Sequence, residues 1–190
     1  MQEVRVIADA GTGWGYRLDG VARGLEFGEG VVAQAGEWSE GEREYYQPWK
    51  ELVVFEKMLE IEGERLRGAS LLFLSDATAA VAYINKGSGP SELMSKVMRR
   101  IFSRCVELEL SVWADHISGD LMKDAGVDSL SRWGEFSVAK GVFKAFDSNP
   151  RWGRYGGAKG FDMDLYASRK SARCERFCAR RSASAEGAVG

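Results

Sequence analysis

The sequence predicts an α/β domain over residues 1–133, with a mixed five-stranded sheet and helices on both faces. Near the N-terminus, three strand-like segments follow one another with short glycine-rich links, a pattern typical of an antiparallel meander. After residue 48 the spacing of apolar residues changes to the helical period, and helices then alternate with two further strand-like segments. Strands followed by alternating helices and strands favour a mixed sheet.

The five strands are predicted from β-branched residues, alternation and apolar runs. They are expected at residues 4–9, 16–20, 31–38, 70–75 and 108–115. Residues 70–75 form a continuous apolar run, which is typical of a strand buried on both faces. Residues 108–115 alternate apolar and polar side chains, which predicts a half-buried strand near an edge of the sheet.

Four helices are predicted from the 3.6-residue apolar period. Their expected bounds are 49–62, 77–86, 92–106 and 127–133. Pro48 stands at the start of the first helix, Gly87 ends the second and Ser91 is a suitable N-cap for the third. We expect a loop between the last strand and the last helix, from His116 to Ala125.

Residues 134–190 differ in composition from the predicted domain. They are rich in Gly, Ser, Ala and Arg, and residues 151–190 hold nine Lys/Arg against four Asp/Glu. We expect a basic, partly ordered C-terminal extension with a disordered end. The chain as a whole has 190 residues, of which 45% are hydrophobic, and a formal net charge of −2, which excludes a collagen-like or wholly disordered protein.

Membrane insertion and secretion are not expected. No run of 18 apolar residues is present, so we predict no membrane span and no membrane partner. The N-terminal residues lack the apolar core of a secretory signal, and three sparse cysteines do not suggest a disulfide framework. We therefore expect an intracellular protein, cytoplasmic or nuclear.

Four acidic residues stand at unusual positions. Asp9 ends the first strand, Asp76 follows the most apolar strand, and Asp128 opens the last helix. Glu51 falls on the apolar face of its helix, where an ionised carboxylate costs on the order of several kcal/mol unless it is compensated. The helix dipole offsets only about 0.3–1 kcal/mol of that cost. Either a basic residue at the rim of the face pairs with Glu51, or a bound cation does.

The predicted sheet brings these acids together. Strands 4–9 and 70–75 would be neighbours, so Asp9 and Asp76 would lie at one edge, beneath the helix that carries Glu51. Converging carboxylates repel one another, and a hard divalent cation relieves that repulsion, so oxygen-only ligands point to Mg²⁺ or Mn²⁺. Two such ions about 4 Å apart can assist in-line cleavage of a phosphodiester.

Six segments, in this order, resemble the ribonuclease H domain of retroelement reverse transcriptases, in particular the DIRS-type and related LTR-retrotransposon domains. The segments are Ile7–Gly15, Gly36–Ser39, Trp49–Leu52, Leu74–Gly87, His116–Gly119 and Val127–Arg132. Further along, Phe161–Arg169 is similar to the segment that follows this domain in the polyproteins of the family. The resemblance therefore covers most of the predicted domain.

The resemblance implies a ribonuclease H-like fold and an endoribonuclease that hydrolyses the RNA strand of RNA–DNA hybrids. The cofactor would be two Mg²⁺ ions, which Mn²⁺ can replace. The metal-binding acids of the family fall on Asp9, Glu51, Asp76 and Asp128, and its loop histidine, which assists proton transfer or product release, falls on His116. The family also implies a reverse transcriptase polymerase domain as a partner in the parent polyprotein.

Basic residues on the helix at 92–106 are candidates for binding the hybrid. They lie largely off the apolar stripe of the helix and are Lys96, Arg99, Arg100 and Arg104. On this interpretation they contact the sugar–phosphate backbone, whose charge dominates affinity for nucleic acids. A solvated helix face without a partner is the alternative.

Three other classes of protein are compatible with parts of the pattern. A catalytically silent ribonuclease H-like module, kept for binding or as a polyprotein spacer, would share the fold without the chemistry. An actin-like or sugar-kinase ATPase shares the sheet, but needs two such domains and about twice this length. A proofreading exonuclease would carry a second acid two residues after Asp9, where this chain has Gly11.

Overall fold

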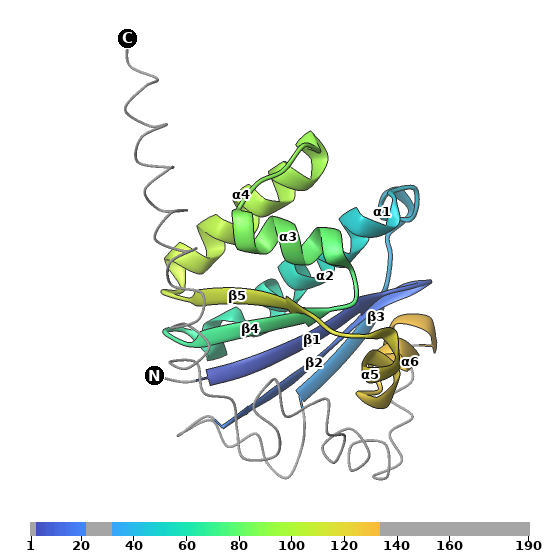
Figure 1. Cartoon of the computed structure of the whole chain (residues 1–190), viewed down its shortest axis with the longest axis horizontal. Helices are drawn as coiled ribbons and strands as arrows, with labels where there is room; N and C mark the ends of the chain where they lie inside the picture. The colour runs from blue at the N-terminus through green and yellow to red at the C-terminus, as the bar shows by residue number, and fades with distance from the viewer. Residues whose placement is uncertain (1–2, 22–31, 134–190) are drawn as a thin grey trace.

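The structure is a computed structural model that describes residues 3–21 and 32–133 (Figure 1). The strands are β1 (Glu3–Ala10), β2 (Gly13–Val21), β3 (Val32–Glu37), β4 (Ser70–Ser75) and β5 (Ser111–His116). The helices are α1 (Glu40–Arg43), α2 (Gln47–Glu62), the 3₁₀ helix η1 (Gly63–Leu66), α3 (Thr78–Lys86), α4 (Glu92–Glu107), α5 (Gly119–Asp124) and α6 (Val127–Trp133).

The strands form one five-stranded sheet in the order β3-β2-β1-β4-β5. Strand β2 pairs antiparallel with both β1 and β3, whereas β4 pairs parallel with both β1 and β5. This arrangement confirms the predicted fold class, a ribonuclease H-like fold whose mixed sheet has three antiparallel strands followed by two parallel strands. It also confirms that the apolar run of β4 lies between two strands and is buried along its whole length.

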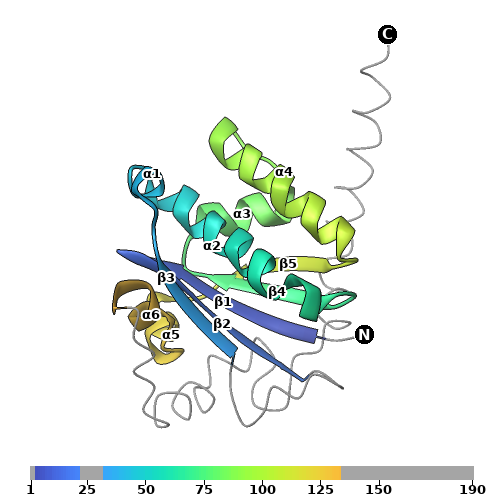
Figure 2. The ribbon, with the colours of Figure 1, turned by 180° about the vertical axis from the view of Figure 1, so that it is seen from behind.

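Helices cover both faces of the sheet (Figures 1 and 2). On one face α2, α3 and α4 pack over the larger core, in which Phe55 of α2 and Phe73 of β4 lie with ring centroids 4.6 Å apart. On the other face, Ile7 and Leu74 pack against the buried Leu121 and Met122 of α5. Because β1 and β4 present apolar side chains to both cores, the centre of the sheet is the most buried part of the fold.

The segment between β5 and α6 differs from the expected loop, because it contains the short helix α5. Its N-cap Ser118 accepts a hydrogen bond from the backbone N of Leu121 at 3.3 Å, and Leu121 and Met122 are buried. A helix of six residues is too short to display an apolar period, so the sequence pattern did not indicate it. Strand β5 likewise begins at Ser111 rather than at residue 108, because Leu108 caps α4.

Strand β5 lies at an edge of the sheet, as predicted. The side chain of Asn85, on α3, exchanges two hydrogen bonds with the backbone of Ala114 in this strand. Its Nδ2 donates to the carbonyl oxygen at 2.8 Å, and its Oδ1 accepts from the amide nitrogen at 2.9 Å. An amide side chain therefore occupies backbone groups of β5 that point away from β4.

Two further sequence predictions concern the C-terminal extension and the absence of a membrane span. The C-terminal extension predicted at residues 134–190, which includes Phe161–Arg169, lies outside the described residues. Within residues 3–21 and 32–133, no helix has the length and apolar character needed to cross a bilayer.

Candidate metal centre

Three acidic side chains meet where β1 and β4 end. Asp9, Glu51 and Asp76 each offer a carboxylate oxygen, and these oxygens lie within 4.8 Å of one another. Asp9 is only 7% exposed and Glu51 only 3% exposed, whereas Asp76 is half-buried. Two of the three carboxylates are therefore largely withdrawn from water.

The fold explains why these acids converge. Strands β1 and β4 are parallel neighbours, with Ile7 opposite Leu74, so their C-terminal ends lie side by side. Asp9 is the penultimate residue of β1 and Asp76 follows the last residue of β4. Helix α2 begins at the same edge, which places Glu51 beside both. Asp9 lies 42 positions before Glu51, and Glu51 lies 25 positions before Asp76, yet the three meet because the strands are parallel and α2 begins at their ends.

Glu51 is held by neutral hydrogen-bond donors. Its Oε1 accepts from Nε2 of Gln47 at 2.7 Å, and its Oε2 accepts from the backbone N of Ala10 at 3.1 Å. Among the described residues, no arginine or lysine forms an ion pair with Glu51. Of the two ways in which the charge of Glu51 could be compensated, pairing with a basic residue is therefore not seen.

The protonation of the buried acids is shifted strongly by their surroundings. Burial, together with the nearby Asp9 carboxylate, raises the pKa of Glu51 to about 9, although the hydrogen bonds from Gln47 and Ala10 oppose the rise. Burial also raises the pKa of Asp9 to about 6, although the hydrogen bond from Ser131 opposes the rise. Carboxylate oxygens are the ligands that a hard divalent cation prefers. Such an ion would also relieve the repulsion between these partly buried carboxylates, so the residues fit it.

Asp128 stands beside this group rather than within it. It lies on α6 with its side chain 24% exposed, and its Oδ1 accepts from Nε of Arg132 at 2.9 Å. Its charge nevertheless contributes to the raised pKa of Asp9, and the charge of Arg132 opposes that effect. The fourth acid predicted from the sequence is thus close to the centre, but it is paired with a cation from its own helix.

Three residues at the site were absent from the sequence prediction. Gln47 donates to Glu51, Ser131 donates from Oγ to Oδ2 of Asp9, and Arg132 pairs with Asp128. The signal that could have identified them is helical spacing, because Gln47 precedes Glu51 by four residues. Ser131 and Arg132 follow Asp128 by three and four residues, which are the spacings of side chains that share a helix face.

His116 is exposed at the end of β5, where it is paired in register with Ser75, the residue before Asp76. Its backbone N–H donates to Oδ1 of Asp115 at 2.9 Å. The chain that follows passes close to the site, since a Cβ on Gly119 would lie 3.7 Å from Oδ2 of Asp76. The structure therefore places His116 on the strand next to Asp76, outside the group of three acids.

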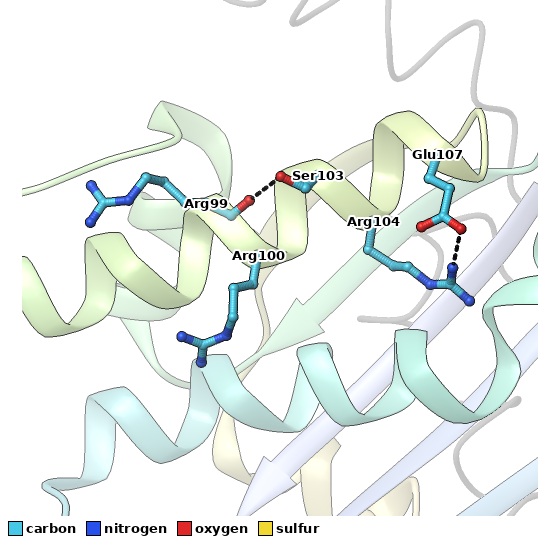
Figure 3. A pocket seen from close by; sticks show the side chains of 5 residues that line it. All are labelled: Arg99, Arg100, Ser103, Arg104 and Glu107. Atoms are coloured by element: carbon cyan, nitrogen blue, oxygen red, sulfur yellow. Dashed lines mark hydrogen bonds and ion pairs between the residues drawn. The ribbon is translucent and has the colours of Figure 1, made fainter.

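Of the four basic residues predicted to bind nucleic acid, all on α4, Lys96, Arg99 and Arg100 are exposed and Arg104 is half-buried. Three of them line a shallow hollow of about 380 Å³ together with Ser103 and Glu107 (Figure 3): Arg99, Arg100 and Arg104. Each of the three is paired with a glutamate: Arg99 with Glu92, Arg100 with Glu56, and Arg104 with Glu64 and Glu107. The pairs with Glu56 and Glu64 join α4 to α2 and η1, which gives two of these arginines a structural function.

Comparison with known proteins gave matches among solved structures alone, because no family model and no curated protein matches the chain. RNase H1 from the halophilic archaeon Halobacterium salinarum is 11% identical, over 67% of this chain and 93% of that chain, with a TM-score of 0.47. The N-terminal RNase H domain of a Mycobacterium tuberculosis protein is 11% identical, over 76% and 99%, with a TM-score of 0.48. LC11-RNase H1 in complex with an RNA/DNA hybrid is 14% identical, over 67% and 92%, with a TM-score of 0.42.

Proposed function

We propose that this protein is a metal-dependent endoribonuclease that hydrolyses the RNA strand of RNA–DNA hybrids. The observation that carries the proposal is the meeting of Asp9, Glu51 and Asp76 at the ends of two parallel strands, with Glu51 held by neutral donors. Ionised carboxylates at such short distances repel one another, and a divalent cation bound between them relieves that repulsion. The cation supported best is Mg²⁺, with Mn²⁺ as a substitute.

On this proposal, each acidic side chain and His116 has a separate role in binding the ions and the substrate. When bound, two Mg²⁺ ions would supply an activated water and charge stabilisation for the leaving oxygen of an in-line displacement. Asp9 and Asp76 would hold the first ion, and Glu51 would hold the second and orient the scissile phosphate. Asp128 would complete the second site. Its carboxylate would then have to leave its ion pair with Arg132 and bind the metal ion instead. His116 would assist proton transfer or product release from β5.

The substrate class follows from the resemblance of six ordered segments to retroelement ribonuclease H domains. A hybrid presents phosphates on both strands and 2′-hydroxyls on one, and the hydroxyls distinguish RNA from DNA. Lys96 would contact phosphates directly. Arg99, Arg100 and Arg104 would do so while they remain paired with glutamates of α4, α2 and η1. The same resemblance supports a parent reverse transcriptase polyprotein and a polymerase domain as partner.

The test is cleavage of a labelled RNA–DNA hybrid by the full chain in Mg²⁺ or Mn²⁺. Asp76→Asn keeps the size of the side chain but removes its charge, so we expect the rate to fall at least roughly 100-fold. The matched control is Asp120→Asn, which alters an exposed acid of α5 outside the group of three. Equal rates for the wild type and Asp76→Asn would discard the mechanism.

One observation favours a second candidate, a catalytically silent module of the same fold. Asp128 is paired with Arg132, so the fourth acid already has a cation. Calorimetric titration with Mg²⁺ separates the two candidates. A nuclease should bind the ion at millimolar concentration or below, whereas the absence of binding in that range would favour the silent module.

A further inference from the structure

We propose that Ser131 is a positioning residue of the metal centre, whose hydroxyl holds the carboxylate of Asp9 in its ligating orientation and joins it to the helix that carries Asp128. The inference rests on the proposed function, because it assigns a residue to the same metal centre. Ser131 is not itself a proposed metal ligand: it lies on α6 and donates a hydrogen bond to a carboxylate that is one.

The hydrogen bond from Ser131 is fully buried. The residue has 0% exposure, and its Oγ donates to Oδ2 of Asp9, 122 positions away in the sequence. The same Oγ lies 3.1 Å from the backbone carbonyl oxygen of Asp128, one helical turn earlier. A hydroxyl has a single proton, and a carboxylate is a stronger acceptor than a neutral carbonyl, so the proton goes to Asp9 when that group is ionised.

Other contacts fix the position of α6 independently of this bond. The hydroxyl of Thr12, in the turn after β1, donates to the backbone carbonyl oxygen of Arg132 at 2.8 Å. Helix α6 also lies directly on β2, because Gly15 has no side chain: a Cβ there would lie 2.5 Å from Cβ of Leu130. The backbone of Ser131 is therefore held against the sheet, and its hydroxyl has little freedom to withdraw from Asp9.

The chemical consequence concerns the readiness of Asp9 to bind a cation. A carboxylate that accepts a hydrogen bond at one oxygen cannot rotate freely, so the orientation of both its oxygens toward a bound cation is fixed. Hydrogen bonds to ligating carboxylates typically change metal affinity by roughly 10- to 100-fold when they are removed.

The experiment measures Mg²⁺ and Mn²⁺ binding by isothermal titration calorimetry on the full chain. Ser131→Ala removes the hydroxyl, and we expect its affinity for either ion to fall roughly 10- to 100-fold. Ser131→Thr retains the hydroxyl and should remain within about threefold of the wild type. The matched control is Ser129→Ala on the same helix, where the half-buried side chain lies outside the bond to Asp9, and it should leave the affinity unchanged.

Thermal unfolding in EDTA separates positioning from general stability. Weaker binding by Ser131→Ala, with rescue by Ser131→Thr and a folded metal-free protein, supports the proposal. If Ser131→Ala fails to fold, Ser131→Cys, a weak donor of similar size, replaces it in the same comparison. If the wild type binds metal and the variant without the donor binds equally well, the positioning role is overturned and the proposed function stands. If the wild type binds neither ion at millimolar concentration, both proposals are overturned.

Discussion

At the scale of the residue, Glu51 is an acidic side chain whose ionised form is strongly disfavoured by burial. It lies 3% exposed on the apolar face of α2, and its hydrogen-bond donors, Gln47 and the amide of Ala10, are neutral. Burial raises its pKa to about 9, from an ordinary value of 4.5. In the absence of metal, Glu51 therefore remains protonated in the folded protein at a pH where the unfolded chain has already released the proton.

We predict that the metal-free protein loses stability as the pH rises. The contribution of Glu51 is fully present below its unfolded pKa of 4.5 and declines as the pH approaches the folded value of about 9. Glu51→Gln should remove this part of the decline and raise the free energy of unfolding at pH 8 by roughly 2–4 kcal/mol. Urea denaturation in EDTA at pH 5 and pH 8 measures the effect.

The control for this prediction is Glu60→Gln, an exposed acid of the same helix. It should leave the difference between pH 5 and pH 8 as it is in the wild type. An equal pH dependence in the wild type and Glu51→Gln would show that Glu51 is ionised in the folded protein without metal, contrary to the prediction.

At the scale of the element, the first residues of β2 determine how closely α6 can approach the sheet. Gly15 is buried under α6, and a Cβ there would lie 2.5 Å from Leu130, which is far inside normal contact distance. Gly13 is crowded from the other side, where a Cβ would lie 2.4 Å from the carbonyl oxygen of Gly36. These glycines allow a helix and two strands to meet next to Asp9.

We predict that Gly15→Ala destabilises the protein by about 1–3 kcal/mol, because the added methyl group forces α6 away from β2. The comparison is Gly41→Ala in α1, where a Cβ would have no atom within 4 Å and alanine favours the helix. Chemical denaturation of both variants measures the difference. Equal stabilities would indicate that α6 is not held against β2 in solution.

Strong periodic elements could be predicted from the sequence, whereas a short helix could not. Residues 70–75 were assigned correctly, because a continuous apolar run has few alternatives to a central strand. Helix α5 was missed because six residues show no period, and its burial depends on a sheet formed elsewhere in the chain. The convergence of Asp9, Glu51 and Asp76 followed from strand adjacency, which the pattern indicated.

The pairing of Asp128 with Arg132 and the bond from Ser131 to Asp9 could not be predicted from the pattern. Both depend on the exact rotation of α6, and a sequence period gives the face of a helix but not which side chain meets a particular carboxylate. The basic residues of α4 show the same limit, because their glutamate partners on α2 and η1 are distant in sequence.

At the scale of the whole molecule, every strand and helix that the structure describes lies within residues 3–133. The two hydrophobic cores are built from these elements, and the group of three acids belongs to them as well. The domain boundary predicted at residue 133 stays a prediction.

We predict that a fragment of residues 1–133 folds and binds Mg²⁺ with the affinity of the full chain, within about threefold, because the described cores and acids lie inside it. Thermal unfolding and calorimetry on the fragment and the full chain provide the comparison. A fragment that is unfolded, or that has lost metal affinity, would show that residues 134–190 belong to the domain.

The contact between Asn85 and Ala114 has a consequence for how copies of this protein meet in concentrated solution. An exposed sheet edge offers unpaired amide and carbonyl groups to any passing strand, and such edges are templates for fibrous aggregation. In β5 the amide side chain of Asn85 already satisfies these groups at Ala114. A foreign strand must displace Asn85 before it can pair with β5 at Ala114, so this side chain hinders strand addition at that edge of the sheet.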